Sequence, residues 1–250
     1  MGYAMVSGAG DVVTFGLPLH TSLNVNSQGR RVVDIAVGPS GMGYWLATSA
    51  GEVLVFGDSP HHGSIAALGD GREVVAIAVL PTGLGYYMVT NDGEVHAFGT
   101  AEFHGSLELP PQSPIADILI APDGGGYWLV GSDGGVFTFG SVPFLGSAAS
   151  LELSNPIVSA AVTPTGEGYW MVTKSGAVVC FGDAPDLGWL SDVGLEGPVV
   201  SLASSRRAIG YWITTVRGEV RAFGDVLFPG TAPPGVLISP VVSMAPSALS

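Results

Sequence analysis

Apolar and polar positions follow a pattern that recurs about every 42 residues along this chain. A Gly-Tyr pair opens each copy of the pattern, at intervals of 41 or 42 residues: Gly2, Gly43, Gly85, Gly126, Gly168 and Gly210. A fixed period of this length is typical of repeat architectures, in which each copy forms one supersecondary unit. The chain therefore contains six copies of one unit.

Each copy contains four segments that predict β-strands. The first is a short apolar run, such as Val74–Leu80, which is typical of a strand buried on both faces. A turn rich in Pro and Gly precedes the second segment, which begins with Gly-Tyr. A two-residue turn, such as Asp92-Gly93, predicts a type I′ hairpin to the third segment, which ends on Phe-Gly. A weaker fourth segment carries Gly-Ser, as at Gly63-Ser64, or a variant of it.

Four antiparallel strands in each of six copies predict an all-β fold, a six-bladed β-propeller, with residues 1–250 as a single domain. The chain starts in second-strand phase at Gly2-Tyr3 and finishes with a first strand at Val241–Ala245. We expect the N- and C-terminal strands to share one blade and so to close the ring. Closure would also protect the edges of the sheets.

The charge balance excludes some classes of partner. With 21 acidic and 8 basic residues, the net charge is −13, which disfavours nucleic acid and anionic membrane surfaces. Hydrophobic residues make up 47% of the chain, enough for a large core, yet no apolar run approaches the roughly 18 residues of a membrane helix. The single cysteine, Cys180, lies in an apolar run and is interpreted as a small buried side chain. We expect a monomer.

One polar position recurs within the apolar first strands. In a propeller these strands are innermost, so this position should face a central channel. It holds two carboxylates, three hydroxyls and one alanine: Asp34, Asp117, Ser159, Ser201, Ser243 and Ala76. A channel filled with water is one interpretation. The other is a ligand-binding site, in which the oxygen atoms would suit a hard cation better than a transition metal. No other cofactor and no catalytic residue is predicted.

Histidine recurs on the fourth segment of three consecutive copies, at His20, His62 and His104. Equivalent positions on outermost strands should lie too far apart to bind one metal ion, so no metal site is predicted. These histidines are instead candidates for a rim that fills a repeated slot or contacts a partner. Positions where one copy departs from the others are further rim candidates: Trp189, Arg206 and Arg207.

The aromatic pair of the second strand is present in every copy as Tyr, followed in most copies by Trp. Such side chains could stack on sugars, but a position filled alike in all copies favours packing between blades with a bonded hydroxyl.

The unit Asn91–Gly99 followed by Gly105-Ser106-Leu107 resembles the repeat of the regulator of chromosome condensation family. The fuller pattern Pro-Thr-Gly-x-Gly-Tyr-Trp…Asp-Gly-x-Val-x-x-Phe-Gly-Asp-Ala is more similar to repeat domains of actinobacterial secreted and cell-wall proteins. Those domains often accompany peptidoglycan hydrolases. The resemblance covers the whole chain and implies a location outside the cell or in the cell wall, as part of a larger protein. Met1–Met5 carries no basic segment typical of an export signal.

Three functions remain open at this point. The first is a non-catalytic binding module that recognises a cell-envelope glycan or a protein partner through one loop face or the channel mouth. The second is a hydrolase or lyase that uses the channel carboxylates Asp34 and Asp117. The third is a structural scaffold with no ligand of its own.

Overall fold

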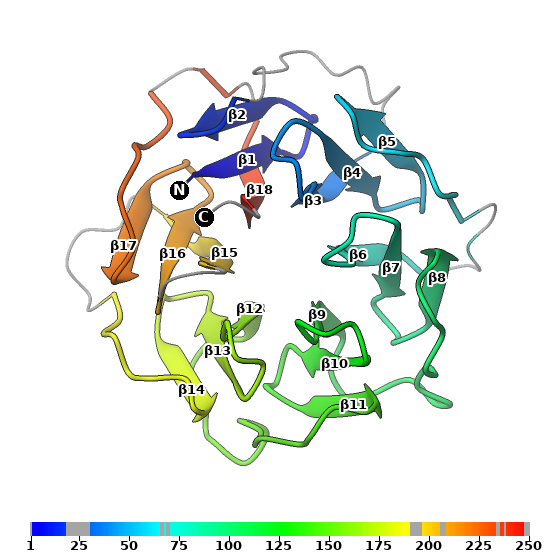
Figure 1. The fold of residues 1–250 in the computed structure, drawn as a ribbon. Helices are drawn as coiled ribbons and strands as arrows, with labels where there is room; N and C mark the ends of the chain where they lie inside the picture. The colour runs from blue at the N-terminus through cyan, green and yellow to red at the C-terminus, as the bar shows by residue number, and fades with distance from the viewer. Residues whose placement is uncertain are drawn as a thin grey trace.

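A computed structural model describes residues 2–18, 31–65, 68, 71–190, 197–205, 209–233, 236–237 and 239–247. Within these residues the chain is all-β, with 18 strands in six three-stranded antiparallel sheets. The sheets are similar to one another and are arranged around a central axis (Figure 1). The tandem repeat of the sequence is therefore a repeat of sheets.

Each sheet has an inner, a middle and an outer strand. The inner strands are β3 (Val32–Val37), β6 (Val74–Val79), β9 (Ile115–Ile120), β12 (Ile157–Val162), β15 (Val199–Ser204) and β18 (Val241–Pro246). The middle strands are β4 (Tyr44–Thr48), β7 (Gly85–Thr90), β10 (Gly126–Gly131), β13 (Gly168–Thr173), β16 (Gly210–Thr215) and β1 (Tyr3–Ser7). The outer strands are β5 (Val53–Phe56), β8 (Val95–Gly99), β11 (Val136–Gly140), β14 (Val178–Gly182), β17 (Val220–Gly224) and β2 (Val12–Phe15).

The prediction of a six-bladed propeller with four strands per blade in a closed ring is wrong. The six sheets are separate and three-stranded, and none of them is closed or curled. The predicted fourth strand fails at its glycine, because Gly63 has a φ of 141°, a value that does not continue a regular ladder. The segment keeps one backbone bond to the hairpin, from Ile65 N to Gly51 O, while Ser64 Oγ accepts the N–H of Val53. A serine side chain thus occupies the place of a strand partner.

The two ends of the described chain lie in one sheet, in the order β18-β1-β2. Tyr3 pairs with Pro246 and Val6 with Ser243, so the last strand is the inner strand of the sheet that the first strand begins. Figure 1 shows the N- and C-terminal strands side by side. The phase of the repeat, which placed a first strand at 241–245 and a second strand at residue 3, predicted this pairing.

The hairpin between the middle and outer strands is one residue longer than predicted. Gly93 N donates to Thr90 O, and Thr90 N donates to Glu94 O, so the loop has three residues, with Gly93 at a φ of 88°. This geometry is a tight turn followed by a glycine bulge, not a type I′ turn. Glycine is needed at this one position because its backbone is left-handed.

Single backbone bonds link each sheet to the next at this hairpin end. Val74 N, at the start of β6, donates to Ser49 O in the hairpin of the preceding sheet, at 3.0 Å. The same bond recurs at each of the six inner strands, including Val32 N to Gly8 O and Val241 N to Val216 O. Neighbouring sheets are otherwise joined by side chains.

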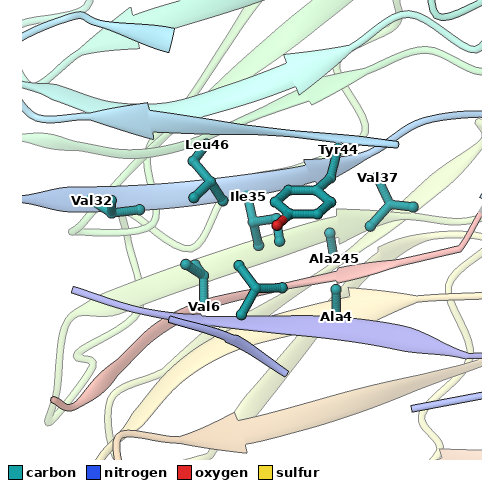
Figure 2. Packing of buried hydrophobic residues seen from close by; sticks show 9 residues of the cluster. Ala4, Val6, Val32, Ile35, Val37, Tyr44, Leu46 and Ala245 are labelled. Carbon is teal, nitrogen blue, oxygen red and sulfur yellow. The ribbon is translucent and has the colours of Figure 1, made fainter. Parts of the chain in front are cut away.

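Apolar packing between sheets forms the core. Middle strands are buried along their whole length, because both of their faces are covered by neighbouring sheets. Figure 2 shows one such cluster, where Ala4 and Val6 of β1 face Ile35 of β3 and Leu46 of β4. Removing this apolar surface from water contributes roughly 25 cal/mol per Å². The cluster joins the sheet that holds both chain ends to its neighbour.

The aromatic pair of the middle strand forms what we call the aromatic corner of each sheet. The Tyr169 hydroxyl donates to Gly146 O of the preceding unit at 2.5 Å, and the Trp170 indole donates to Pro185 O of its own unit at 2.9 Å. Burial raises the pKa of Tyr169 to about 12, so its hydroxyl remains a donor. The same two bonds recur elsewhere, for example from Tyr127 to Gly105 O and from Trp128 to Pro143 O. The prediction that these aromatics pack between units with a bonded hydroxyl is confirmed.

Candidate functional site

The inner strands surround a cavity of about 390 Å³. Its lining begins at the level of Asp34 and Asp117 and continues to the residues that follow the inner strands, among them Pro81, Pro122 and Pro164. Pro122 is exposed, so the cavity reaches the surface at this end, which we call the proline face. The opposite face, which carries the hairpins, is called the hairpin face. Along β9 the cavity extends over five residue steps, roughly 16 Å.

A bulge in each inner strand directs the recurrent polar position toward the axis. In β3 the register shifts between Val32 and Asp34, and a shift at the same place in β9 leaves Ala116 as the extra residue before Asp117. A β-bulge turns the following side chains relative to the regular alternation of a strand. The predicted phase of polar residues is therefore found at the cavity, where Asp34, Asp117 and the three equivalent serines form the cavity floor: Ser159, Ser201 and Ser243.

Asp34 joins three inner strands by hydrogen bonds. Its Oδ1 accepts the hydroxyl of Ser243 at 2.6 Å and the N–H of Ile35 at 2.8 Å. Its Oδ2 accepts the N–H of Ile77, on the next inner strand, at 2.8 Å. The carboxylate therefore satisfies a backbone donor that would otherwise lack a partner where two separate sheets meet.

Asp117 repeats this arrangement between β9 and β12. Its Oδ1 accepts the N–H of Ile118 at 2.8 Å, and its Oδ2 accepts the N–H of Ala160 at 2.9 Å. The hydroxyl of Ser159 donates to the same Oδ2 at 3.1 Å. A carboxylate oxygen has two lone pairs, so Oδ1 of Asp117, which accepts one bond, keeps acceptor capacity.

Ser201 performs the strand-joining role that Asp34 and Asp117 have in their own units. Ser201 Oγ accepts the N–H of Met244 on the next inner strand at 3.2 Å, as Asp34 accepts that of Ile77. Ala76, at the same position of β6, is buried and does not line the cavity. Ser201 shows that a hydroxyl can join two inner strands, and Ala76 shows that one unit has no side-chain oxygen at this position, so the two carboxylates exceed what the scaffold requires.

Both carboxyl groups titrate far above their ordinary range. Burial raises the pKa of Asp34 to about 6, although the hydrogen bonds from Ser243, Ile77 and Ile35 act in the opposite direction. Burial, and after it the negative charge of Asp34, raise the pKa of Asp117 to about 7. Both side chains keep some accessible surface because they border the cavity. Near neutral pH the pair therefore carries between one and two negative charges.

No basic side chain lines the cavity among the described residues. The described basic residues lie at or beside the hairpin face: Arg31, Arg72, Lys174, Arg217 and Arg221. Several of them pair with acids there, as Arg72 does with Asp92 and Glu94. Five exposed acids lie on the proline face, where no described basic residue lies: Asp58, Asp123, Glu167, Asp183 and Asp225. Exposed acids such as Glu73 and Asp133 also lie at the hairpin face, but among the described residues only that face has basic side chains beside its acids, so the negative charge of the proline face is not balanced.

The histidine candidates do not form one site. His62 packs on Tyr86 of the next unit, with ring centroids 5.5 Å apart, and its Nε2 lies 3.1 Å from Gly83 O. His104 packs on Tyr127 of a different unit, and its Nε2 is buried without a partner in the structure. Each histidine fills a slot beside an aromatic corner, and Leu187 fills the equivalent slot beside Gly224.

The other predicted site residues lie away from the cavity or outside the described residues. Trp189, where other units carry Ser or Thr, is 59% exposed and lies on the outside of the molecule, far along its unit from the inner strand. His20, Arg206 and Arg207 lie outside the described residues. Cys180 is half-buried, and burial raises the pKa of its thiol, which disfavours the reactive thiolate.

Sequence reasoning missed the depth of the cavity and the prolines at its mouth, but not its wall of small side chains. The wall includes Ala78, Leu119 and Ala161 and ends at the prolines that open each turn. The small residues two positions after the polar phase were a signal for this wall, because convergence on an axis requires small side chains. Nothing in the sequence showed that the prolines after the inner strands surround the cavity mouth, since Pro before Gly is also typical of an ordinary turn.

No protein-family model matches the chain, and no curated protein matches it. Among the described residues, no group of three or more His, Cys, Asp or Glu side chains is placed to hold a metal ion. The same part of the chain has no helix of the length and apolarity needed to cross a membrane. The functional argument therefore depends on the geometry of the cavity.

Proposed function

We propose that this chain is a non-catalytic binding module and that the central cavity and its mouth on the proline face form the recognition site. The observation that carries the proposal is a cavity of about 390 Å³ with polar groups on its floor and apolar walls. Small-molecule sites commonly have volumes of 300–1,000 Å³, mostly apolar linings and a few placed polar groups. The cavity suits a small ligand or the terminal group of a larger one.

A cell-envelope glycan is the partner class that we favour. Hydroxyl-rich ligands match a floor of two carboxylates and three serines, all of which can accept hydrogen bonds. Exposed apolar side chains on the proline face offer contacts to the rest of such a ligand: Met42, Leu84 and Ile209. The resemblance of the repeat to actinobacterial secreted and cell-wall proteins supports the same class and a location outside the cell, within a larger protein.

A glycan array tests this proposal, with Ala78→Leu as the informative variant. Ala78 lines the cavity, and Leu119 occupies the equivalent position of the next unit, so the fold accommodates leucine there. We expect saturable binding by the unaltered chain and a loss of at least tenfold in the variant, with an unchanged melting temperature. Binding that is equally strong in Ala78→Leu would place recognition outside the cavity. No binding to any glycan or cell-wall fraction would leave a scaffold without a ligand.

The raised pKa values favour one alternative, a hydrolase or lyase that uses Asp117 and Asp34. Two buried carboxyl groups that titrate near 6 and 7 are a common arrangement for general acid–base catalysis. The binding module is preferred because both oxygens of each group accept structural hydrogen bonds from backbone N–H groups. Turnover of glycoside substrates that Asp117→Ser abolishes would support the enzyme instead.

A further inference from the structure

We propose that the cavity binds an organic cation, a group such as a protonated amine that donates hydrogen bonds to Asp34 and Asp117 on the cavity floor. This inference rests on the proposed binding function and specifies the chemistry of its ligand. It would make an amino sugar, rather than a neutral sugar, the preferred terminal group of a glycan.

The cavity floor carries more charge than the joining of strands requires. Ser201 shows that a hydroxyl is enough to accept the N–H of the next inner strand, yet two of the six units carry a carboxylate at this position. A buried carboxylate without a compensating cation is costly. Hydrogen bonds compensate part of this cost, but no described basic residue lines the cavity to supply a cation.

The charges of the proline face favour the approach of a cation to the cavity. The exposed acids of the proline face have no basic residue beside them, while those of the hairpin face lie among the described Arg and Lys side chains. A cleft with walls of low dielectric and charges of one sign concentrates ions of the opposite sign. A cation therefore approaches the mouth favourably, and an anion is repelled before it reaches the floor.

The hydrogen bonds of the two carboxylates favour an organic cation over a metal ion. Both oxygens of Asp34 accept backbone N–H groups, and those of Asp117 do the same, so neither carboxylate is free to chelate. A calcium ion needs six to eight oxygen ligands. An ammonium group needs only acceptor lone pairs, and one oxygen of each carboxylate, Oδ2 of Asp34 and Oδ1 of Asp117, accepts a single bond and retains a lone pair.

The length of the cavity restricts the source of the cation. The cavity spans roughly 16 Å from floor to mouth along β9, which exceeds the reach of an extended lysine side chain. A flat protein surface therefore cannot place a lysine amine on the floor. A free amine, or an amine on a narrow saccharide end, can enter.

Isothermal titration at pH 7 tests the inference with three probes and two variants. The probes are D-glucosamine, its neutral analogue N-acetyl-D-glucosamine, and n-butylamine, with calcium chloride as the metal arm. In Asp34→Ser/Asp117→Ser, the serines mimic those of other units and preserve the strand-joining oxygen. The matched control Glu108→Gln/Glu152→Gln removes the same number of charges from exposed positions. Circular dichroism establishes that each variant is folded.

We expect saturable binding of glucosamine and butylamine to the unaltered chain and to the control, at least tenfold weaker binding to the serine variant, and no binding of the neutral analogue. Equal binding of both sugars would overturn the cation inference and leave the proposed function standing. Amine binding that the serine variant retains would overturn it as well, as would tighter binding of calcium than of either amine. If no probe binds, the cation inference fails, while the glycan array decides the proposed function separately.

Discussion

The aromatic corners and the cavity floor are built by the same repeat, but they differ in how uniformly the repeat is kept. Every described corner has a tyrosine and most have a tryptophan. In three consecutive units the tyrosine hydroxyl and the indole N–H donate to equivalent carbonyls. The floor instead varies between Asp, Ser and Ala at one position. Uniform positions hold neighbouring sheets together, so each copy needs them alike. A ligand on the axis meets all six units at once, so its site can differ between copies.

The largest effect is expected at an aromatic corner. Trp170 is fully buried, so Trp170→Ala should lower the free energy of unfolding by about 3–5 kcal/mol through the lost burial and the cavity left behind. Urea denaturation measures this loss. The control is Trp189→Ala, at an indole that is 59% exposed, where a change within about 0.5 kcal/mol is expected. Similar losses for both variants would erase the contrast between uniform and variable positions.

We expect ionisation of Asp34 and Asp117 to lower the free energy of unfolding as the pH rises. The folded-state pKa values of Asp34 and Asp117 lie near 6 and 7, above the unfolded values near 4, so the folded chain retains protons that the unfolded chain has lost. The stability contributed by this pair is therefore highest below about pH 4 and falls as the pH rises through 6 and 7. Since one pKa unit corresponds to about 1.4 kcal/mol, the change for the pair is on the order of a few kcal/mol.

The double variant Asp34→Ser/Asp117→Ser measures this cost. Its free energy of unfolding, compared with that of the unaltered chain, should improve by a few kcal/mol between pH 4 and pH 8. If the free energies of unfolding of the two proteins changed in parallel with pH, the carboxyl groups of Asp34 and Asp117 would not be buried where their charged form is disfavoured.

Much of the fold could be predicted from the sequence. The repeat, the pairing of the two chain ends and the polar phase at Asp34 all follow from spacing, because a fixed period places equivalent residues in equivalent surroundings. The fourth strand did not follow. Gly63-Ser64 has the composition of a strand end. In the structure the backbone turns at Gly63, and the Ser64 hydroxyl accepts the N–H of Val53 that a fourth strand would otherwise bond.

The site could be predicted only in part, for a related reason. Sequence identified which residues share a phase, and for Asp34 and Asp117 a shared phase meant a shared cavity. For His62 and His104 it meant two separate slots, since positions far from the axis are kept apart by the sheets between them. A periodic pattern gives the angle of a residue around the axis, and its distance from the axis has to come from the structure.

Removing a single hydroxyl from an aromatic corner should have a moderate effect. Tyr169→Phe keeps the ring but leaves Gly146 O without its donor, so we expect a loss of about 1 kcal/mol in the free energy of unfolding. Thermal unfolding measures this loss. No change would mean that the ring alone holds the two units together.

The smallest effects are expected in the slots beside the corners. His104→Leu should be neutral or stabilising by up to about 1 kcal/mol, because Nε2 of His104 is buried without a partner and Leu187 fills the same slot in another unit. His62→Leu should be slightly destabilising, since it removes the contact between Nε2 and Gly83 O. A marked loss of stability in His104→Leu would show that its nitrogen has a role that packing does not explain.

Carbon-detected NMR of the aspartate carboxyl groups, followed against pH with and without D-glucosamine, tests the central claim most directly. We expect two carboxyl groups, assigned to Asp34 and Asp117 by their serine variants, that titrate near pH 6 and 7 and whose pKa values fall when the amine is added. Two carboxyl groups that titrate near pH 4, with pKa values unchanged by the amine, would contradict a cavity floor that binds an organic cation.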